Sequence, residues 1–351
     1  MSLWGNQLSG PTDPAKDAAW PDPPPRKGFF TDTSICIGCK ACEVACKEWN
    51  MLPMDALGMT GTSYDNTTAL GANTWRHVAF VEQGPEQIQR AREEGARLVD
   101  LGMPRLRSAV ESPAIRPGSE GVDAVAGVQS GTAGPTPEVG EAAYAVQPEI
   151  PQVRWLMASD VCKHCTHAGC LDVCPTGALF RTEFGTVVVQ DDVCNGCGYC
   201  VAACPFGVIE RRKDPDMTGA QQPRQIGIAN KCTLCYDRIG DGGTPACAQA
   251  CPTTSIQYGD LDELRERART RMETLHGQGF TEARLYGTDE EDGVGGTGSV
   301  FLLLDEPEVY GLPPDPVVTT KDLPDIFRKA GYAGLLMLAG AAAAFVGGRK
   351  Q

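Results

Sequence analysis

Residues 194–205 read CNGCGYCVAACP, in which four cysteines are separated by gaps of two, two and three residues and followed by a proline. Three thiolates at two-residue gaps hold three corners of one [4Fe–4S] cubane, and the fourth cysteine of such a run ligates the other cluster of a pair. Gly196 and Gly198 let backbone amides approach the sulfides, and Pro205 redirects the chain. This stretch therefore predicts paired iron–sulfur clusters.

Three further motifs resemble this one, and the four together use all sixteen cysteines of the chain. Motif one has the same spacing but Lys47 in place of the proline, motif two widens one gap to four residues, and motif four widens it to eleven. In chain order, the candidate metal ligands are Cys36, Cys39, Cys42 and Cys46; Cys162, Cys165, Cys170 and Cys174; Cys194, Cys197, Cys200 and Cys204; and Cys232, Cys235, Cys247 and Cys251. We expect four [4Fe–4S] clusters.

Two other uses of cysteine fit this pattern less well. Disulfides need an oxidising compartment, and cysteines three residues apart make poor bridges in such numbers. Structural zinc sites pair two Cys-x2-Cys knuckles or include histidine. His164 and His167 lie between cysteines of motif two, but cysteine already supplies four ligands per cubane, so we expect neither to bind metal. No catalytic constellation stands out, which predicts a non-catalytic subunit.

Charge further limits the function. The formal net charge of −14 argues against nucleic acid as a partner, because phosphate binding needs a basic surface. Basic residues nevertheless gather in or beside the motifs, where they either offset the negative charge of thiolate-ligated clusters or lie on the surface. These residues are Lys40, Lys47, Lys163, Arg211, Arg212, Lys213, Lys231 and Arg238.

The rest of the chain predicts an α+β fold, with two ferredoxin-like two-cluster units in a loop-rich body. Thr186–Val189 and Val300–Leu304 are expected to be strands, and Asp260–His276 a helix with a capping box of Asp260 and Glu263. The predicted order is a Pro-rich leader at 1–30, the first unit at 31–82 and 231–259, an insertion at 83–153, the second unit at 154–230, and a helix, strand and extended connector at 260–328.

The C-terminal segment 330–348 has no charged residue, and basic residues flank it. At ~1.5 Å per residue, a helix of this length just crosses a ~30 Å hydrocarbon core. Its small residues favour close packing on a partner helix, so we expect one transmembrane anchor; a buried soluble helix is the alternative. No signal peptide is expected at the N-terminus, so export would need the signal of a partner.

The motifs resemble the iron–sulfur (beta) subunit of respiratory formate dehydrogenase, within the four-cluster subunits that serve molybdopterin enzymes. The resemblance extends from the motifs into two later stretches, Gly293–Thr297 and Tyr310–Pro313, and omits the leader and the insertion. The stretches that carry it in the motifs are Ser34–Cys42 with Glu48–Asn50, Asn195–Cys200 with Cys204–Phe206, and Lys231–Cys235.

The resemblance implies an electron-transfer function. Electrons from formate oxidation at a molybdenum or tungsten bis-pterin site in a catalytic subunit would pass through this chain to a membrane cytochrome b and quinone. It also implies attachment to the cytoplasmic membrane, with the body on the extracytoplasmic side and lipid around the anchor. The same role in another molybdopterin reductase or a membrane hydrogenase, or a free-standing polyferredoxin, remains an alternative.

Spacing leaves the ligand sets open. Only nineteen residues, Pro175 to Val193, separate motifs two and three, which favours exchange of their fourth ligands, but motif three is also close enough to pair with motif four. The family resemblance favours nested pairing, with the one–four pair toward the catalytic subunit. It gives site 1 as Cys36, Cys39, Cys42 and Cys251; site 2 as Cys46, Cys232, Cys235 and Cys247; site 3 as Cys162, Cys165, Cys170 and Cys204; and site 4 as Cys174, Cys194, Cys197 and Cys200.

Overall fold

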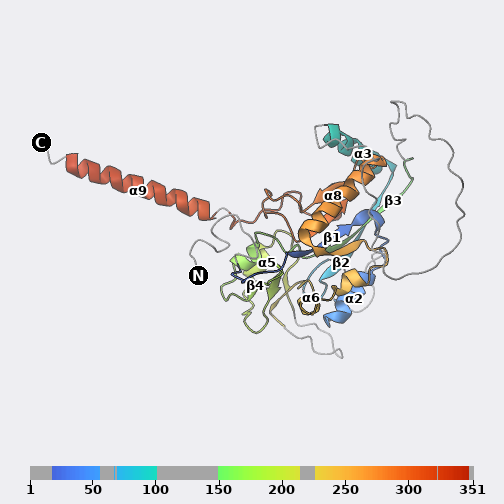
Figure 1. Cartoon of the computed structure of the whole chain (residues 1–351), viewed down its shortest axis with the longest axis horizontal. Helices are drawn as coiled ribbons and strands as arrows, with labels where there is room; N and C mark the ends of the chain where they lie inside the picture. Colours follow the sequence, from blue (N-terminus) through green and yellow to red (C-terminus); the bar gives the residue numbers. More distant parts are fainter. Residues whose placement is uncertain are drawn as a thin grey trace, which may run out of the picture.

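A four-stranded sheet is the largest regular element of the body (Figure 1). The structure is a computed structural model that describes residues 18–55, 67, 69–100, 149–213, 226–321 and 323–347. Strand β1 (Lys27–Asp32) runs parallel to β10 (Ser299–Leu303) and antiparallel to β8 (Ile256–Asp260), and β9 (Arg284–Tyr286) pairs with the far edge of β10. The sheet thus joins segments from the two ends of the chain.

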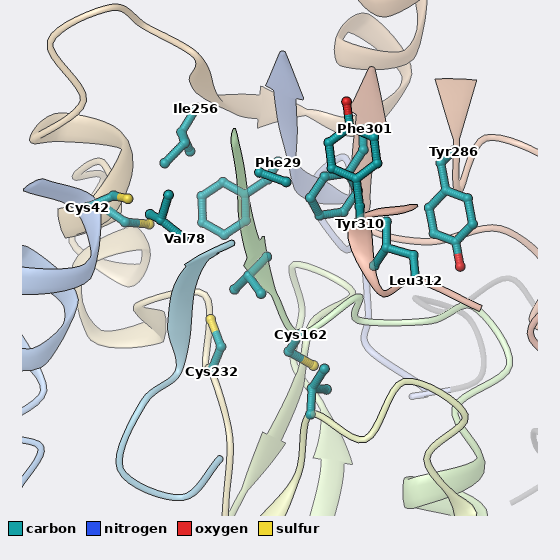
Figure 2. Close-up of a cluster of buried hydrophobic side chains, with 14 of the residues drawn as sticks. Phe29, Cys42, Val78, Cys162, Cys232, Ile256, Tyr286, Phe301, Tyr310 and Leu312 are labelled. Atoms are coloured by element: carbon teal, nitrogen blue, oxygen red, sulfur yellow. The ribbon is translucent and has the colours of Figure 1, made fainter. Parts of the chain in front are cut away.

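The two faces of this sheet bury different partners. Side chains alternate along a strand, so Phe29 and Phe30 point to opposite faces. Helix α8 (Leu261–Gly277) covers the face of Phe30, where its own Leu264 and Ala268 join Val300 and Leu302 in one apolar cluster. On the other face, Figure 2 shows Phe29 and Phe301 in a second cluster that also holds Cys42, Cys162 and Cys232. The core therefore extends directly into the cysteine motifs.

A two-stranded ladder brings motif one close to the start of motif two. Strands β2 (Arg76–Gln83) and β3 (Arg154–Val161) pair antiparallel over eight residues, with Arg76 opposite Val161. They border the insertion on either side. Helix α3 (Pro85–Asp100) follows β2 within that insertion, where the sequence analysis assigned no helix. Residues 101–148, which contain most of the insertion, lie outside the described residues.

The cysteine motifs occupy short helices and loops. These are η2 (Thr33–Ile35) and α2 (Ala41–Trp49) in motif one, α4 (Gly169–Asp172) in motif two, α5 (Tyr199–Ala203) in motif three, and α6 (Tyr236–Gly240) and α7 (Ala246–Gln249) in motif four. Two small sheets support motifs two and three, formed by β4 (Leu179–Arg181) with β5 (Val187–Val189) and by β6 (Glu210–Arg211) with β7 (Ala229–Asn230).

The predicted elements are largely confirmed. The mixture of short helices and small sheets agrees with the expected α+β class, and the expected strands and helix appear as β5, β10 and α8. The capping box is wrong: Asp260 is the N-cap of α8, but its side chain makes no capping hydrogen bond and pairs with Lys27 instead. The connector is only partly extended, because Pro307–Tyr310 forms the 3-10 helix η3.

The C-terminal helix α9 (Leu323–Gly347) extends away from the body (Figure 1). Its large apolar side chains are exposed, with Leu336 and Met337 each more than two thirds accessible. Within the part of the chain that the structure describes, no helix is both long enough and apolar enough to span a membrane.

Candidate metal centres

All four motifs share one backbone feature. The second residue after the first cysteine has a positive φ in each motif, at +63° for Gly38, +45° for His164, +70° for Gly196 and +61° for Leu234. This left-handed step curls the loop between the first two cysteines, so that both thiols turn toward the same side. Glycine adopts it without strain, and glycine is the residue at this position in motifs one and three.

Close packing also restricts two of these positions. A Cβ atom on Gly38 would lie 2.5 Å from Met157 Sδ, and one on Gly196 would lie 2.4 Å from the carbonyl oxygen of Gly227. The neighbour of Gly38 is a side chain that can move, whereas the neighbour of Gly196 is backbone. The loops of motifs one and three are therefore held against strands or loops of other segments.

The cysteines of site 1 line one cavity. Cys36, Cys39 and Cys42 come from motif one, and Cys251 reaches the same cavity from the end of motif four. Val78 of β2 and Ile256 of β8 contribute its apolar wall. Burial raises the pKa of Cys42 to about 11, and Ser159 Oγ lies 3.2 Å from its sulfur.

The cysteines of site 2 meet around the C-terminal part of α2. Burial raises the pKa of Cys46 well above its usual value, and neighbouring thiols add to this effect. Those neighbours all come from motif four: Cys232, Cys247 and Cys235. Cys232, Cys235 and Cys247 are buried, as is Cys46.

The cysteines of site 3 line a second cavity, with Phe206, Val208 and Ile209 among its apolar residues. Burial raises the pKa of Cys165 well above its usual value, and neighbouring thiols raise it further. These are Cys162, Cys204 and Cys170, so the fourth cysteine of motif three lies among the first three of motif two.

The cysteines of site 4 are the first three of motif three and the last of motif two. Burial raises the pKa of Cys200 to about 11, with further contributions from Cys194, Cys174 and Cys197. Burial also acts to raise the pKa of Cys174, but hydrogen bonds from the backbone of Leu179, from the side chain and backbone of Thr176 and from the backbone of Ala178 outweigh it and lower that pKa. These donors stabilise a thiolate at Cys174.

Three close pairs of thiols connect the sites in sequence. Besides the larger effect of burial, Cys247 raises the pKa of Cys42, Cys162 raises that of Cys232, and Cys200 raises that of Cys170. Site 1 is thus next to site 2, site 2 next to site 3, and site 3 next to site 4. At the two ends lie Cys39 and Cys197, which are the exposed members of the sixteen cysteines.

The donor sets fit cubane clusters. The cavities of sites 1 and 3 are each lined by four cysteines, three from one motif and one from another, together with apolar side chains. Among the described residues, no group of three or more Cys, His, Asp or Glu side chains has the geometry to hold a single metal ion. Because burial raises the pKa of most of these thiols, ligation to iron must displace their protons.

The basic residues of the motifs divide between core and surface. Lys163, Lys231 and Arg212 are buried, whereas the side chain of Lys213 is 87% exposed. Lys163 pairs with Asp160 and lies 4.8 Å from the ring centre of Phe301. The remaining four have local contacts: Lys40 with Glu43, Lys47 with Asp55, Arg211 with the carbonyl oxygen of Gly196, and Arg238 with the ring of Trp49.

The two histidines of motif two are both buried. His164 Nδ1 accepts a hydrogen bond of 3.1 Å from the backbone amide of Val187. Burial lowers the pKa of His164 well below its usual value, which keeps this ring neutral next to site 3.

The sequence analysis missed a buried cation outside the motifs. Arg76, the first residue of β2, is 1% exposed and lies among cysteines of sites 1 and 2. Burial lowers its pKa, but Cys247, Cys42, Cys232 and Cys46 outweigh that effect and raise it. Spacing gives no signal for such a residue, because only the pairing of β2 with β3 brings it to the cysteines.

Comparisons with known proteins agree with this geometry. Residues 153–261 match the family model described as a 4Fe-4S dicluster domain. The chain is 33% identical over 291 residues to the formate dehydrogenase iron–sulfur subunit of Haemophilus influenzae. The aligned region covers 82% of this chain and 68% of the relative. It is 32% identical over 293 residues to the nitrate-inducible formate dehydrogenase iron–sulfur subunit of Escherichia coli, at 82% and 73% coverage.

A shorter match has higher identity. The thiosulfate reductase electron transfer subunit of Salmonella typhi is 48% identical over 103 residues, which cover 29% of this chain and 48% of the relative. Together with the cysteine motifs, the matched dicluster domain identifies [4Fe–4S] clusters as the cofactors of this chain.

Proposed function

Because the chain belongs to the family of formate dehydrogenase iron–sulfur subunits, we propose that it relays electrons from a formate-oxidising molybdenum or tungsten subunit to a membrane cytochrome b and quinone. The observation that carries this proposal is the match to formate dehydrogenase iron–sulfur subunits over 82% of the chain. The clusters supply one-electron redox chemistry, and the chain fixes their order and their surroundings.

The nested scheme assigns one cluster to each site. The cavities support it for sites 1 and 3, because each cavity is lined by the four cysteines of one set. The neighbouring thiols of Cys46 and Cys200 support it for sites 2 and 4. Each cluster would thus be held between two motifs. Sites 1 and 2 join motifs one and four, which are far apart in the sequence, and sites 3 and 4 join the adjacent motifs two and three.

Exposure supports sites 1 and 4 as the two ends of the relay. The exposed cysteines Cys39 and Cys197 belong to the terminal sites, where electrons enter and leave, and sites 2 and 3 contain no exposed cysteine. The connector that leads to α9 passes beside motif two, since Thr320 Oγ1 donates a hydrogen bond to Asp172, which lies between Cys170 of site 3 and Cys174 of site 4. Site 1 would accordingly face the catalytic subunit and site 4 the membrane subunit.

Helix α9 would serve as the anchor. Support comes from its length of 25 residues and from its exposed apolar side chains, which include Phe327, Leu335 and Leu338. Large apolar surfaces of this kind need a lipid or protein partner. We place the segment 330–348, which includes the C-terminal part of α9, in the cytoplasmic membrane against the cytochrome b, with the body on the extracytoplasmic side.

A second candidate is the same relay in another molybdopterin reductase. The match of 48% to the thiosulfate reductase subunit favours it over a free polyferredoxin, but this match covers only 29% of the chain. The longer matches, over 82% of the chain, favour formate.

The experiment is anaerobic purification of the intact complex through a tag on this chain, followed by addition of formate. Reduction should bleach the broad brown absorption of the clusters. If formate leaves this absorption unchanged while dithionite bleaches it, the catalytic partner does not oxidise formate. Addition of thiosulfate or another acceptor to the reduced complex then tests the second candidate by reoxidation.

A further inference from the structure

Arg76 has two buried nitrogens without a hydrogen-bond partner among the described residues. Its Nη1 donates to Ser159, at 3.2 Å from the carbonyl oxygen and 3.0 Å from Oγ, whereas Nε and Nη2 have no acceptor. Buried N–H groups of a charged side chain are costly when unpaired, and in native proteins such groups normally have a protein, water or ion partner. An acceptor for these two nitrogens is therefore expected on the side of the guanidinium that faces away from Ser159.

The surroundings of Arg76 indicate which acceptor this is. The guanidinium carbon lies 4.7 Å from the ring centre of Phe29, which closes one side of the group. The nearby groups that can carry the opposite charge are cysteine thiols, which become negative when they lose a proton. Their effect on the pKa of Arg76 decreases in the order Cys247, Cys42, Cys232 and Cys46. Three of these belong to site 2 and one, Cys42, belongs to site 1. No carboxylate within the described residues is bonded to Arg76, so its charge is not already neutralised by an acid.

Ser159 extends the influence of Arg76 to site 1. Its Oγ lies 3.0 Å from Nη1 and 3.2 Å from the sulfur of Cys42. When Cys42 is a thiolate, the hydroxyl must donate to the sulfur, and it can accept from Arg76 at the same time. Arg76 therefore contacts site 1 through one hydroxyl, and three thiols of site 2 are among the groups that raise its pKa.

We propose that Arg76 is a redox-tuning residue shared by the clusters of sites 1 and 2, to whose sulfur atoms it donates its free N–H groups directly at site 2 and through Ser159 at site 1. This inference rests on the ligand sets proposed above. A fixed cation and N–H···S hydrogen bonds both stabilise the more negative, reduced form of a cluster. Arg76 thus raises the reduction potentials of the clusters at sites 1 and 2.

The test is a redox titration of the purified complex followed by electron paramagnetic resonance. In Arg76→Gln, two of the four cluster signals should become harder to reduce, with the ratio of reduced to oxidised cluster at a fixed potential falling about tenfold or more, which is 59 mV for a one-electron couple. The other two signals should stay in place. Arg76→Lys keeps the charge, so its shift should be less than half as large on the same logarithmic scale.

The matched control is Arg92→Gln. Arg92 is also buried, but it lies on α3 and pairs with Glu282 at 3.7 Å. Its replacement removes a buried guanidinium that does not lie among the cysteines, so the reduction potentials of all four clusters should remain unchanged. Iron and sulfide contents of each variant show whether all clusters are loaded.

A second measurement does not require that the Arg76→Gln variant contains all of its clusters. In the wild-type protein with arginine labelled by heavy nitrogen, pulsed resonance should detect a nitrogen coupling at the site 2 cluster that disappears in Arg76→Lys. Unmoved potentials in a fully loaded Arg76→Gln variant, an equal shift of all four signals, or no such coupling would each overturn this inference alone. Absence of four cubanes from the wild type would overturn the ligand sets as well.

Discussion

Cys42 and Ser159 lie with Sγ and Oγ 3.2 Å apart although 117 residues separate them in the sequence. The contact joins a cysteine of motif one to β3, which leads directly into motif two. The loop of motif one is thus in contact with a strand from a distant part of the chain. This contact depends on tertiary pairing as well as on the motif.

The first prediction concerns metal content. The protein purified without oxygen should contain about sixteen iron atoms and sixteen acid-labile sulfides per chain, since each of four cubanes contributes four of each. Elemental analysis with a sulfide assay measures both. Stoichiometric zinc, or iron sufficient for only three clusters, would be incompatible with four cubanes.

The second prediction concerns Gly196. Its alanine variant must accommodate both a φ of +70° and a Cβ atom 2.4 Å from a backbone oxygen. The matched control is Gly207→Ala, because Gly207 also has a positive φ of +64° but no atom within 4 Å of the added Cβ. Gly207→Ala should cost roughly 1–2 kcal/mol, the cost of left-handed backbone for a residue with a Cβ.

Gly196→Ala should cost clearly more than its control and should also reduce the iron bound at site 4. Denaturant unfolding and iron analysis of the two variants side by side give both quantities. Equal stability and equal iron content in the two variants would show that the contact with Gly227 does not hold the motif three loop.

The third prediction concerns the C-terminal helix. Deletion of residues 330–351 should leave all four clusters intact, because no cysteine lies in that segment. It should weaken attachment to membranes, since it removes exposed apolar residues such as Leu336 and Phe345. Flotation of the isolated chain with lipid vesicles measures attachment without retention by partner subunits. Equal flotation of the truncated and full-length chains would rule out the anchor.

The family, the cofactor type, helix α8 and strands β5 and β10 could be predicted from the sequence, whereas α3 and the β2–β3 ladder were not. Cubane binding needs cysteines at fixed short gaps, so the spacing of the cysteines alone predicts the type of cofactor. Helix α8 and strand β10 follow from local patterns, an apolar stripe and a buried apolar run.

Contacts that depend on distant pairing could not be predicted. The capping box at Asp260 failed because the pairing of β1 with β8 places Lys27 opposite Asp260, and this lysine engages the carboxylate. Arg76 was missed for a similar reason, since its neighbours are set by the β2–β3 ladder across the insertion. No local spacing distinguishes such a buried arginine from a surface one.

The crossed ligation of the clusters is tested most directly by a Cys46→Ser variant, examined by electron paramagnetic resonance at graded potentials. Cys46 belongs to motif one in sequence, but in the structure it lies among Cys232, Cys247 and Cys235. The perturbed signal should therefore match that of Cys235→Ser, while the signal perturbed in Cys36→Ser stays normal. If Cys46→Ser instead perturbs the same signal as Cys36→Ser, each motif ligates its own cluster and the nested arrangement is wrong.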